Sequence, residues 1–583
     1  MAYRTHNCGE LTLSDLGGTV SLAGWVDTIR DHGGVAFVDL RDQYGVTQTV
    51  FHDEALLARL HKESVVSVTG RVVKRDAETV NPKIPTGQLE VHVETLEVLG
   101  ACENTLPFEV ADSTATREDV RLQYRFLDLR NPKVHENILF RAQVVRFLRE
   151  KMESLGFPEI NTPILTCSSP EGARDYIIPS RKHEGKFYAL PQAPQQFKQL
   201  LMVSGFDKYF QIAPCFRDED ARADRSPGEF YQLDFEMAFA TQEDVFAVAE
   251  DVLYDTFEKF GGGKPVSPAP FLRIPYKEAM LRFGTDKPDL RNPLRIVDLT
   301  DFFADVDFKP FRGRPVRGIA APAGKQSKSF FEKMLAFAES IGMKGLGYLT
   351  VLEDGSYKGP IAKFLSDEKQ QSLKADLDLH TDDTLFFISD APKVVDTLAG
   401  QIRTALGERL GLIDEDRFEL CFITDFPMYE RDEDGKLIFT HNPFSMPQGE
   451  LAALETQDPL DILAYQYDIV CNGVELSSGA VRNHRPDVML KAFELAGYPA
   501  EEVERRFGAL FKAFHYGAPP HAGMAPGVDR MLMLLKGEEN IREVIAFPMN
   551  ANAQDLLLGA PNTVSEQQLR EVHIKLRRPV QGE

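Results

Sequence analysis

A charged loop between two strand-like runs constrains the fold of this chain more than any other stretch. Polar and apolar residues alternate over residues 209–217, and the alternation returns over residues 231–236. The loop carries Arg217, Asp218, Glu219, Asp220, Arg222, Asp224 and Arg225. An ordinary solvated hairpin is one interpretation, but interleaved arginines and carboxylates can bind a polyphosphate together with its metal ion. Because buried charges need partners, we predict that the polar face of this strand pair is the floor of a ligand site.

Three further stretches carry a family resemblance. Residues 169–176 read Ser-Pro-Glu-Gly-Ala-Arg-Asp-Tyr, and residues 189–199 read Ala-Leu-Pro-Gln-Ala-Pro-Gln-Gln-Phe-Lys-Gln. Residues 523–530 read Gly-Met-Ala-Pro-Gly-Val-Asp-Arg and precede an apolar run. Together with Phe216-Arg217-Asp218-Glu219, these stretches resemble the class II aminoacyl-tRNA synthetases, and among them the bacterial type of the aspartyl enzymes. The resemblance extends from the first residues to about residue 560.

The bulk properties indicate a multidomain protein of the cytoplasm. A chain of 583 residues is too long for one hydrophobic core and suggests three or more domains. No apolar run approaches the roughly 20 residues that span a bilayer, so no membrane association is expected. The first residues lack the apolar segment of a secretion signal. Six cysteines without a C-x-x-C pair disfavour a zinc site or a disulfide framework.

The formal charge of −23 disfavours non-specific binding of nucleic acid over most of the surface. Any RNA partner must then be recognised by local patches and by shape. Composition alone is typical of an acidic metabolic enzyme, and only the motifs indicate a protein that acts on tRNA.

The N-terminal residues 1–105 are predicted to form an OB-fold β-barrel. Strand-like runs cover residues 20–30, 35–41, 47–51, 65–74 and 89–99. The open face of such a barrel binds single-stranded nucleic acid. Phe37, Gln48 and Glu90 match the anticodon contacts of the family, although a core phenylalanine with solvated polar neighbours is the plainer interpretation. His32, in the turn at residues 30–34, is the fourth candidate anticodon residue.

The rest of the chain is expected to form a catalytic domain in two parts with a domain inserted between them. We predict a linker at residues 106–136, then catalytic residues 137–285, the insertion at 286–420, and the second catalytic part with a C-terminal extension at 421–583. A helix at about 137–155 and an extended segment at 157–163 resemble the first class II motif, which forms a homodimer interface in that family. The expected fold is therefore multidomain α/β (α+β), with the barrel, an antiparallel catalytic sheet and an inserted α+β domain.

A second polar constellation follows from turn geometry. Asn472-Gly473 between two apolar runs predicts a two-residue hairpin that places Val470 opposite Glu475. Asp468 then lies on the same face as Glu475, diagonally and roughly 7 Å away. Two exposed acidic residues are the alternative, but the reverse face is apolar. We predict that the two carboxylates share Mg²⁺ with the phosphates of ATP.

The resemblance implies a role for each matching residue. Arg217 and Arg530 would be catalytic, and Lys198 and Arg482 would pair with the side-chain carboxylate of aspartate. The full set implied for aspartate is Glu171, Gln195, Lys198, Arg217, Asp234, His441 and Arg482. The set implied for ATP is Arg217, Asp218, Glu219, Phe230, Glu475, Gly527, Val528, Asp529 and Arg530. Ser226-Pro227-Gly228 departs from the family pattern, which leaves the ATP role of position 226 open.

The expected activity is the ligation of L-aspartate to the 3′ end of tRNA-Asp, with ATP as the energy source. A histidine at position 32, where many relatives carry leucine, favours an enzyme that also charges tRNA-Asn. A solvated turn residue explains His32 equally well. The alternatives are a tRNA-independent amide-forming enzyme, which the N-terminal barrel disfavours, and a non-catalytic RNA-binding paralogue, which the retained Arg217, Glu219 and Arg530 disfavour.

Overall fold

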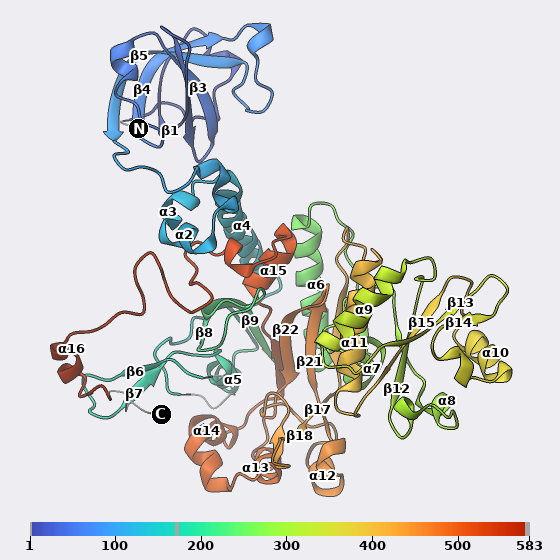
Figure 1. The fold of residues 1–583 in the computed structure, drawn as a ribbon. Coiled ribbons are helices and arrows are strands. Elements are labelled where there is room, and N and C mark those ends of the chain that lie inside the picture. The colour runs from blue at the N-terminus through green and yellow to red at the C-terminus, as the bar shows by residue number, and fades with distance from the viewer. Residues whose placement is uncertain (1–2, 169–173, 578–583) are drawn as a thin grey trace. The chain divides into compact units, whose positions relative to one another are not determined.

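The protein divides into two compact units in the computed structural model, which describes residues 3–168 and 174–577 (Figure 1). The units are Met1–Glu109 and Val110–Glu583. Within the described ranges, no helix combines the length and the apolar character that crossing a bilayer requires.

The N-terminal unit is a closed barrel with strand order β1-β2-β3-β5-β4. The strands are β1 (Thr19–Asp31), β2 (Ala36–Asp42), β3 (Gly45–Phe51), β4 (Val65–Lys74) and β5 (Leu89–Gly100). Alternating residues of each strand point inward, so that Val20, Leu22, Val38, Leu40 and Val66 fill the barrel. The five predicted strands and the predicted OB-type barrel are confirmed.

A seven-stranded sheet forms the centre of the larger unit, with strand order β10-β16-β21-β22-β23-β9-β8. Its strands are β8 (Lys208–Arg217), β9 (Gly228–Ala238), β10 (Leu272–Pro275), β16 (Leu420–Thr424), β21 (Gln466–Cys471), β22 (Val474–Val481) and β23 (His521–Met524). All neighbouring strands are antiparallel except β10 and β16, which are parallel. The sheet therefore agrees with the predicted antiparallel catalytic fold.

Three helices cover the apolar face of this sheet: α4 (Pro132–Ser154), α6 (Gln242–Phe260) and α15 (Val528–Lys536). Their apolar residues pack on strand residues such as Phe235 and Phe422. Helix α4 begins five residues before the predicted start, because Pro132 occupies its first turn and the Asn131 side chain accepts the Lys133 N–H at 2.9 Å. The opposite, polar face of the sheet is left for the site.

The segments on either side of α4 differ from the expectation. After α4, the segment at 157–163 makes one isolated bridge, between Glu159 and Phe210, and is otherwise irregular. Before α4, the expected linker at 106–136 contains η3 (Val110–Ala115), α2 (Glu118–Gln123) and α3 (Arg125–Asp128). Residues from Val110 onward belong to the larger compact unit, and Arg121 and Arg125 bond to Glu543 and to the Ala546 carbonyl near the C-terminal end of that unit.

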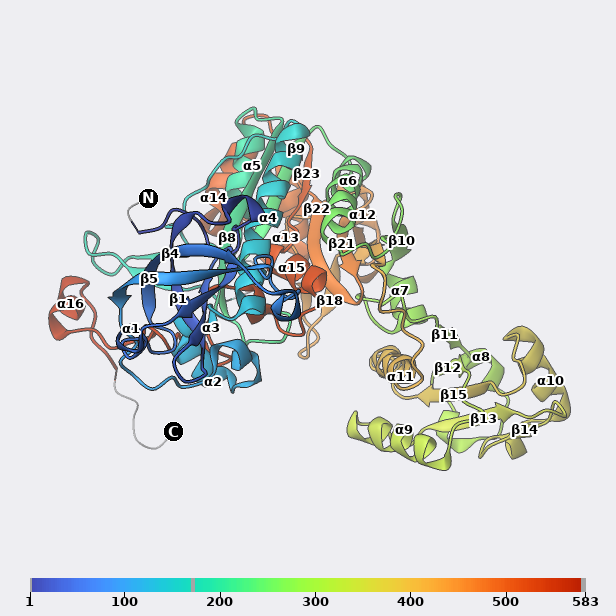
Figure 2. The same ribbon diagram turned by 90° about the horizontal axis from the view of Figure 1, so that it is seen from above.

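The region expected as an insertion contains a second sheet, with strand order β11-β12-β15-β13-β14. These strands are β11 (Ile296–Asp298), β12 (Val316–Ala321), β13 (Gly347–Val351), β14 (Tyr357–Lys358) and β15 (Thr384–Ser389). Helices α9 (Lys328–Ser340) and α11 (Val395–Arg409) pack on the face that carries Phe386, while α8 (Thr300–Phe303) and α10 (Asp367–Asp376) pack on the face of Phe387 (Figure 2). This region therefore has its own layered core.

A close backbone contact between two glycines joins the inserted region to helix α7 (Tyr276–Phe283). Gly284, which ends α7 with φ +71°, approaches Gly400 of α11 so closely that a Cβ on Gly284 would lie 2.3 Å from the Gly400 nitrogen. The buried Arg403 of α11 donates to the carbonyls of Asp289, Asn292 and Leu294 at 2.7–2.9 Å. These three hydrogen bonds fix the backbone of residues 289–294, at the start of the inserted region.

Candidate active site

The polar face of the seven-stranded sheet borders a cavity of about 380 Å³. Most of the residues predicted for aspartate or ATP line it: Gln195, Lys198, Arg217, Glu219, Phe230, His441, Glu475, Arg482, Gly527, Asp529 and Arg530. The residues come from β8, β9, β22, α15 and α5 (Gln195–Val203), and from the loops between them. Segments more than 300 residues apart in the sequence therefore meet at one cavity.

Other predicted residues lie away from the lining. Val528 is a fully buried core residue of α15, and the exposed Asp218 uses its backbone N–H to bond the Arg174 carbonyl. Asp234 and Asp468 are buried behind the lining residues. Glu171 lies outside the described residues.

The hairpin of β8 and β9 places Arg217 and Phe230 side by side. In the register Cys215 pairs with Phe230 and Arg217 with Gly228, so Arg217 and Phe230 share a face. The Arg217 guanidinium carbon lies 4.9 Å from the centroid of the Phe230 ring, a cation–π contact. Its Nε atom is buried and has no hydrogen-bond partner among the described residues. A buried donor at a cavity wall favours an anionic or carbonyl ligand.

Four buried charges lie next to each other at the floor of the cavity, two of them (Lys198 and Arg482) on its lining and two (Asp234 and Glu236) behind it. Lys198 Nζ lies 2.6 Å from Asp234 Oδ1 and 3.5 Å from Glu236 Oε2. The Arg482 fork binds Glu236 with Nε–Oε1 at 2.9 Å and Nη2–Oε2 at 3.2 Å. Tyr209 donates its hydroxyl to the other oxygen of Asp234 at 2.9 Å. The two predicted aspartate-binding cations thus already have carboxylate partners within the protein.

Glu236 is a site residue to which the sequence analysis assigned no role. Burial by itself would raise the pKa of its carboxyl, but Arg482 and Lys198 hold that pKa below its ordinary value. The signal was present in the alternation of Gln232, Asp234 and Glu236 on one strand face. Their partners come from elements distant in sequence, which local alternation does not reveal.

Arg530 and Asp529 occupy the first turn of α15 and have different surroundings. Arg530 donates to the Glu475 carbonyl at 2.7 Å and to the Asp224 carbonyl at 3.1 Å. Asp529 accepts the Tyr231 N–H at 2.9 Å and forms an ion pair with Arg141 of α4. Asp529, predicted to bind ATP, therefore uses both carboxylate oxygens to join α15 to β9 and α4.

The loop between β8 and β9 also reaches the cavity. Glu219 and Arg225 form an ion pair at 2.6 Å, and both line the wall. Ser226, the position of the departure from the family pattern, is buried and lines the cavity as well. A side chain at this position is therefore placed to touch a ligand.

The predicted metal hairpin forms around Asn472-Gly473, whose φ angles of 52° and 81° are those of a type I′ turn. Val470 pairs with Glu475 as predicted, but a bulge between Ile469 and Val470 shifts the register, so that Asp468 faces Ser478. Burial, and secondarily the charge of Glu475, raises the pKa of the Asp468 carboxyl well above its ordinary value. The Asp468 Oδ1 atom has no hydrogen-bond partner among the described residues.

These two carboxylates fit a magnesium ion. A buried carboxylate oxygen without a donor, beside a second carboxylate, gains from a shared cation. Within residues 3–168 and 174–577 no group of three or more His, Cys, Asp or Glu side chains forms a metal cluster. Mg²⁺ is commonly held by one or two carboxylates together with substrate phosphates.

Lys287 is a second site residue without a predicted role. Its Nζ lies 3.3 Å from Glu475 Oε2 and 3.2 Å from Asp286 Oδ2. It belongs to the segment that Arg403 holds, at the start of the inserted region. No local pattern in the sequence connects Lys287 with a carboxylate 188 positions later, so no role was predicted for it.

The four anticodon candidates occur in the barrel. The rings of His32 and Phe37 meet edge-on with centroids 5.6 Å apart. Gln48 donates to Glu90 at 2.9 Å, and Arg30 donates to Gln48 at 3.2 Å. This chain of hydrogen bonds continues through two residues for which no role was predicted. His92 bonds Glu90 at 2.9 Å and His52 at 3.1 Å. An aromatic pair next to a row of hydrogen-bonding groups suits an unstacked base.

Comparisons with known proteins agree with this architecture. Residues 117–551 match the family of tRNA synthetases class II (D, K and N), and residues 20–99 match the OB-fold nucleic acid binding domain. An "Aspartate--tRNA(Asp/Asn) ligase" of Acidiphilium cryptum is 58% identical over 99% of this chain and 98% of its own length. An "Aspartate--tRNA ligase" of Streptomyces coelicolor is 56% identical over 99% of both chains.

A solved structure supports the fold alone. Asparaginyl-tRNA synthetase from Pyrococcus horikoshii, complexed with asparaginyl-adenylate, superposes with a TM-score of 0.57 at 20% identity, covering 93% of this chain and 97% of that one. With the matched family model and the relatives above, the chain belongs to the class II tRNA synthetases and, within them, to the bacterial-type aspartate–tRNA ligases.

Proposed function

We propose that this protein activates L-aspartate with ATP and transfers it to the 3′ end of tRNA-Asp and tRNA-Asn. The observation that carries the proposal is the gathering of Lys198, Arg482, Arg217 and Arg530 around one cavity that also contains the Phe230 ring. Two cations suit a dicarboxylic amino acid, and the remaining two with an aromatic ring suit a nucleotide. The relatives with matching names support this assignment over a tRNA-independent or non-catalytic role.

Selection of aspartate would be electrostatic. Lys198 and Arg482 would share the side-chain carboxylate of the substrate, with Gln195 and Asp234 near its ammonium group. Asparagine carries no charge there and would leave both cations with a weaker partner. Glu171 and His441 complete the proposed aspartate set, and His441 lies on the cavity wall.

In the first step, a carboxylate oxygen of aspartate would attack the α-phosphorus of ATP. The new O–P bond forms as the bond to the β-phosphate oxygen breaks, so that pyrophosphate leaves with the electron pair. Arg217 would contact both the attacking carboxylate and the α-phosphate and stabilise the developing charge. In the second step, a hydroxyl of the terminal ribose of tRNA would attack the aspartyl carbonyl, and AMP would leave.

The adenine ring would lie between Phe230 and Arg530, with Glu219 accepting from its amino group. In the structure Arg217 covers Phe230, and Arg225 pairs with Glu219, so these contacts change partners when ATP binds. Gly527 allows close approach of a ligand, since a Cβ there would meet no atom nearer than 3.6 Å.

Asp468 and Glu475 would hold Mg²⁺ together with the phosphates of ATP. The chemistry such an ion supplies is neutralisation of phosphate charge. Paramagnetic resonance of Mn²⁺ with wild type and Asp468→Asn, in the presence of ATP, measures this binding directly; equal affinities would exclude the site.

Charging of both tRNAs rests on His32. The anticodons of tRNA-Asp and tRNA-Asn differ in one pyrimidine, and the imidazole can donate or accept a hydrogen bond where leucine offers only shape. Relatives named for one tRNA and for both are almost equally similar to this chain, so the comparison leaves the choice to experiment. We expect wild type to charge both tRNAs and His32→Leu to shift the ratio toward tRNA-Asp; a wild type inactive on tRNA-Asn refutes this.

The proposed assembly is a homodimer through α4 and the segment after it. Ile164 and Leu165, directly after that segment, are exposed at 46% and 55%, which favours a covering partner. Sedimentation equilibrium measures this assembly. The six cysteines are all free, which fits the proposed cytoplasmic location.

The overall proposal is tested by pyrophosphate exchange with each amino acid, followed by charging of purified tRNA. We expect exchange that depends on aspartate and not on asparagine. Exchange with another amino acid, or none with aspartate, would remove the assignment.

A further inference from the structure

A short 3-10 helix, η7 (Ile541–Val544), forms part of the cavity wall. Ile541 is buried, lines the cavity, and donates its N–H to the Ala223 carbonyl at 2.8 Å. The next residue of that loop, Asp224, accepts from Arg530 through its own carbonyl at 3.1 Å. The position of η7 therefore determines both a piece of the wall and the loop that holds Arg530.

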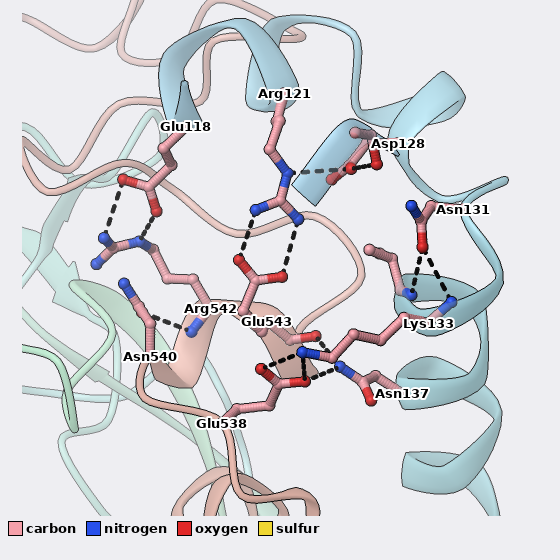
Figure 3. Close-up of polar contacts among 12 residues, drawn as sticks. Glu118, Arg121, Asp128, Asn131, Lys133, Asn137, Glu538, Asn540, Arg542 and Glu543 are labelled. Carbon is pink, nitrogen blue, oxygen red and sulfur yellow. Dashed lines mark hydrogen bonds and ion pairs between the residues drawn. The ribbon is translucent and has the colours of Figure 1, made fainter. Parts of the chain in front are cut away.

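The other side of η7 is bound to α2 by two bidentate ion pairs (Figure 3). Arg542 donates to both carboxylate oxygens of Glu118, at 2.6 and 3.0 Å. Arg121 donates to both oxygens of Glu543, at 2.8 and 2.9 Å. Both arginines are buried, whereas the side chains of Glu118 and Glu543 are 39% and 22% exposed, so water reaches each pair from its carboxylate side.

The order of charges permits one register only. Helix α2 presents acid then base, at Glu118 and Arg121, and η7 presents base then acid, at Arg542 and Glu543. A shift of η7 by one residue would bring like charges together. Partly buried ion pairs of this kind add little net stability, but they can specify one arrangement, and the arginine fork fixes orientation. The interface is thus better suited to positioning than to stabilisation.

A second layer of contacts holds both partners in place. Asp128 accepts from Arg121 at 3.1 Å, which orients the guanidinium toward η7. Glu538, just before η7, accepts from Lys133 at 3.1 Å and from Asn137 at 2.9 Å, both on α4 (Figure 3). Both ends of the interface are therefore anchored on elements of the same compact unit.

We propose that Glu118 and Arg121 are positioning residues for ATP, acting through η7 on Ile541, on the 223–224 carbonyls and on Arg530. They act on the nucleotide because the aspartate-binding cations, Lys198 and Arg482, are held by Asp234 and Glu236 instead. This inference rests on the proposed function for the identity of the nucleotide. It assigns the stretch before α4 a role in substrate binding beyond that of a linker.

The test exchanges the charges of one pair in the full-length protein. Glu118→Arg and Arg542→Glu should each raise the Kd for ATP with Mg²⁺, measured by titration calorimetry, by about tenfold, the usual scale for residues that act through a packed element. The double variant Glu118→Arg/Arg542→Glu restores opposite charges and should return the Kd to within about threefold of wild type. Glu118→Gln, which keeps the side-chain shape, repeats the test if charge reversal impairs folding.

A matched control is the exposed pair Arg282–Glu278 on α7, with atoms 3.1 Å apart. Arg282→Glu should leave the Kd for ATP unchanged, and the KM for aspartate should stay unchanged in every variant. Wild-type affinity in the single variants, or a double variant as weak as the singles, would overturn the inference. Absence of aspartate-dependent exchange in wild type would instead overturn the proposed function. The ratio of the Kd for ATP between variant and wild type would still decide the role of the Glu118–Arg542 pair.

Discussion

Replacing Lys198 with methionine tests how the buried charges beneath the cavity share their partners. Methionine keeps the apolar stem and removes the ammonium group that lies 2.6 Å from Asp234 and 3.5 Å from Glu236. Glu236 retains the Arg482 fork, whereas Asp234 retains only a neutral donor among its hydrogen bonds in the described structure, the Tyr209 hydroxyl. Lys198→Met therefore removes the charged partner of Asp234, whereas Glu236 keeps its own.

Two magnitudes follow from this geometry. Leaving one buried partner uncompensated typically lowers the free energy of unfolding by about 3–5 kcal/mol, and we expect the lower end because Tyr209 still donates. A charge-assisted hydrogen bond to the substrate carboxylate contributes about 1.5–3 kcal/mol. The KM for aspartate should then rise roughly ten- to a hundredfold, with the KM for ATP within about twofold of wild type.

The double variant Lys198→Met/Asp234→Asn separates the two effects. It removes both buried charges, so the free energy of unfolding should recover while the KM for aspartate stays high. Lys151→Met is the matched control, since Lys151 of α4 pairs with Asp255 of α6 at 2.6 Å and lies outside the cavity lining. Urea unfolding and pyrophosphate exchange measure the two quantities. An unchanged KM for aspartate in Lys198→Met, or no recovery in the double variant, would refute the reasoning.

Two other predictions concern Arg217, at the cavity wall, and the buried His521. Arg217→Ala should lower aspartate-dependent exchange by about a hundredfold or more while leaving the unfolding transition in place, since Arg217 packs on the cavity face of Phe230; activity within a few-fold of wild type contradicts its role. Burial lowers the pKa of His521 from 6.5 to about 4, so the unfolded chain binds a proton before the native state does. Stability should therefore be unaffected above pH 6.5 and fall by roughly 3 kcal/mol between pH 6.5 and 4, and His521→Gln should remove that component of the slope in urea unfolding measured against pH.

The parts of the fold that local chemistry determines could be predicted from the sequence. The five barrel strands follow from two-residue alternation, and the hairpin at Asn472-Gly473 follows from residues that tolerate positive φ. The bulge beside Val470 has no such local signal, since it depends on how β21 pairs with both neighbours. The start of α4 had a signal in Asn131-Pro132 that apolar periodicity alone overlooks, because the first turn is polar.

The stretch before α4 shows a different limit of local reasoning. Its residues have weak periodicity, and the helices there are fixed by partners far along the chain. Arg121, for example, binds Glu543, which lies 422 positions away. Such pairs leave no local pattern, so the sequence indicated a linker where the structure has a folded interface.

For the site, the sequence identified the charged groups but not the partners they use. Lys198, Arg482, Glu219 and Arg530 all have protein partners around the cavity, so a substrate must exchange contacts with them. At each of these residues, the binding free energy is the difference between its contact with the substrate and its contact with the protein partner. This difference is smaller than the contribution of a new ion pair. Arg217 differs, because its Nε has no partner within the described part of the chain. A contact there adds a hydrogen bond without breaking one, which is the physical reason to expect Arg217→Ala to lower kcat/KM for aspartate more than Lys198→Met does.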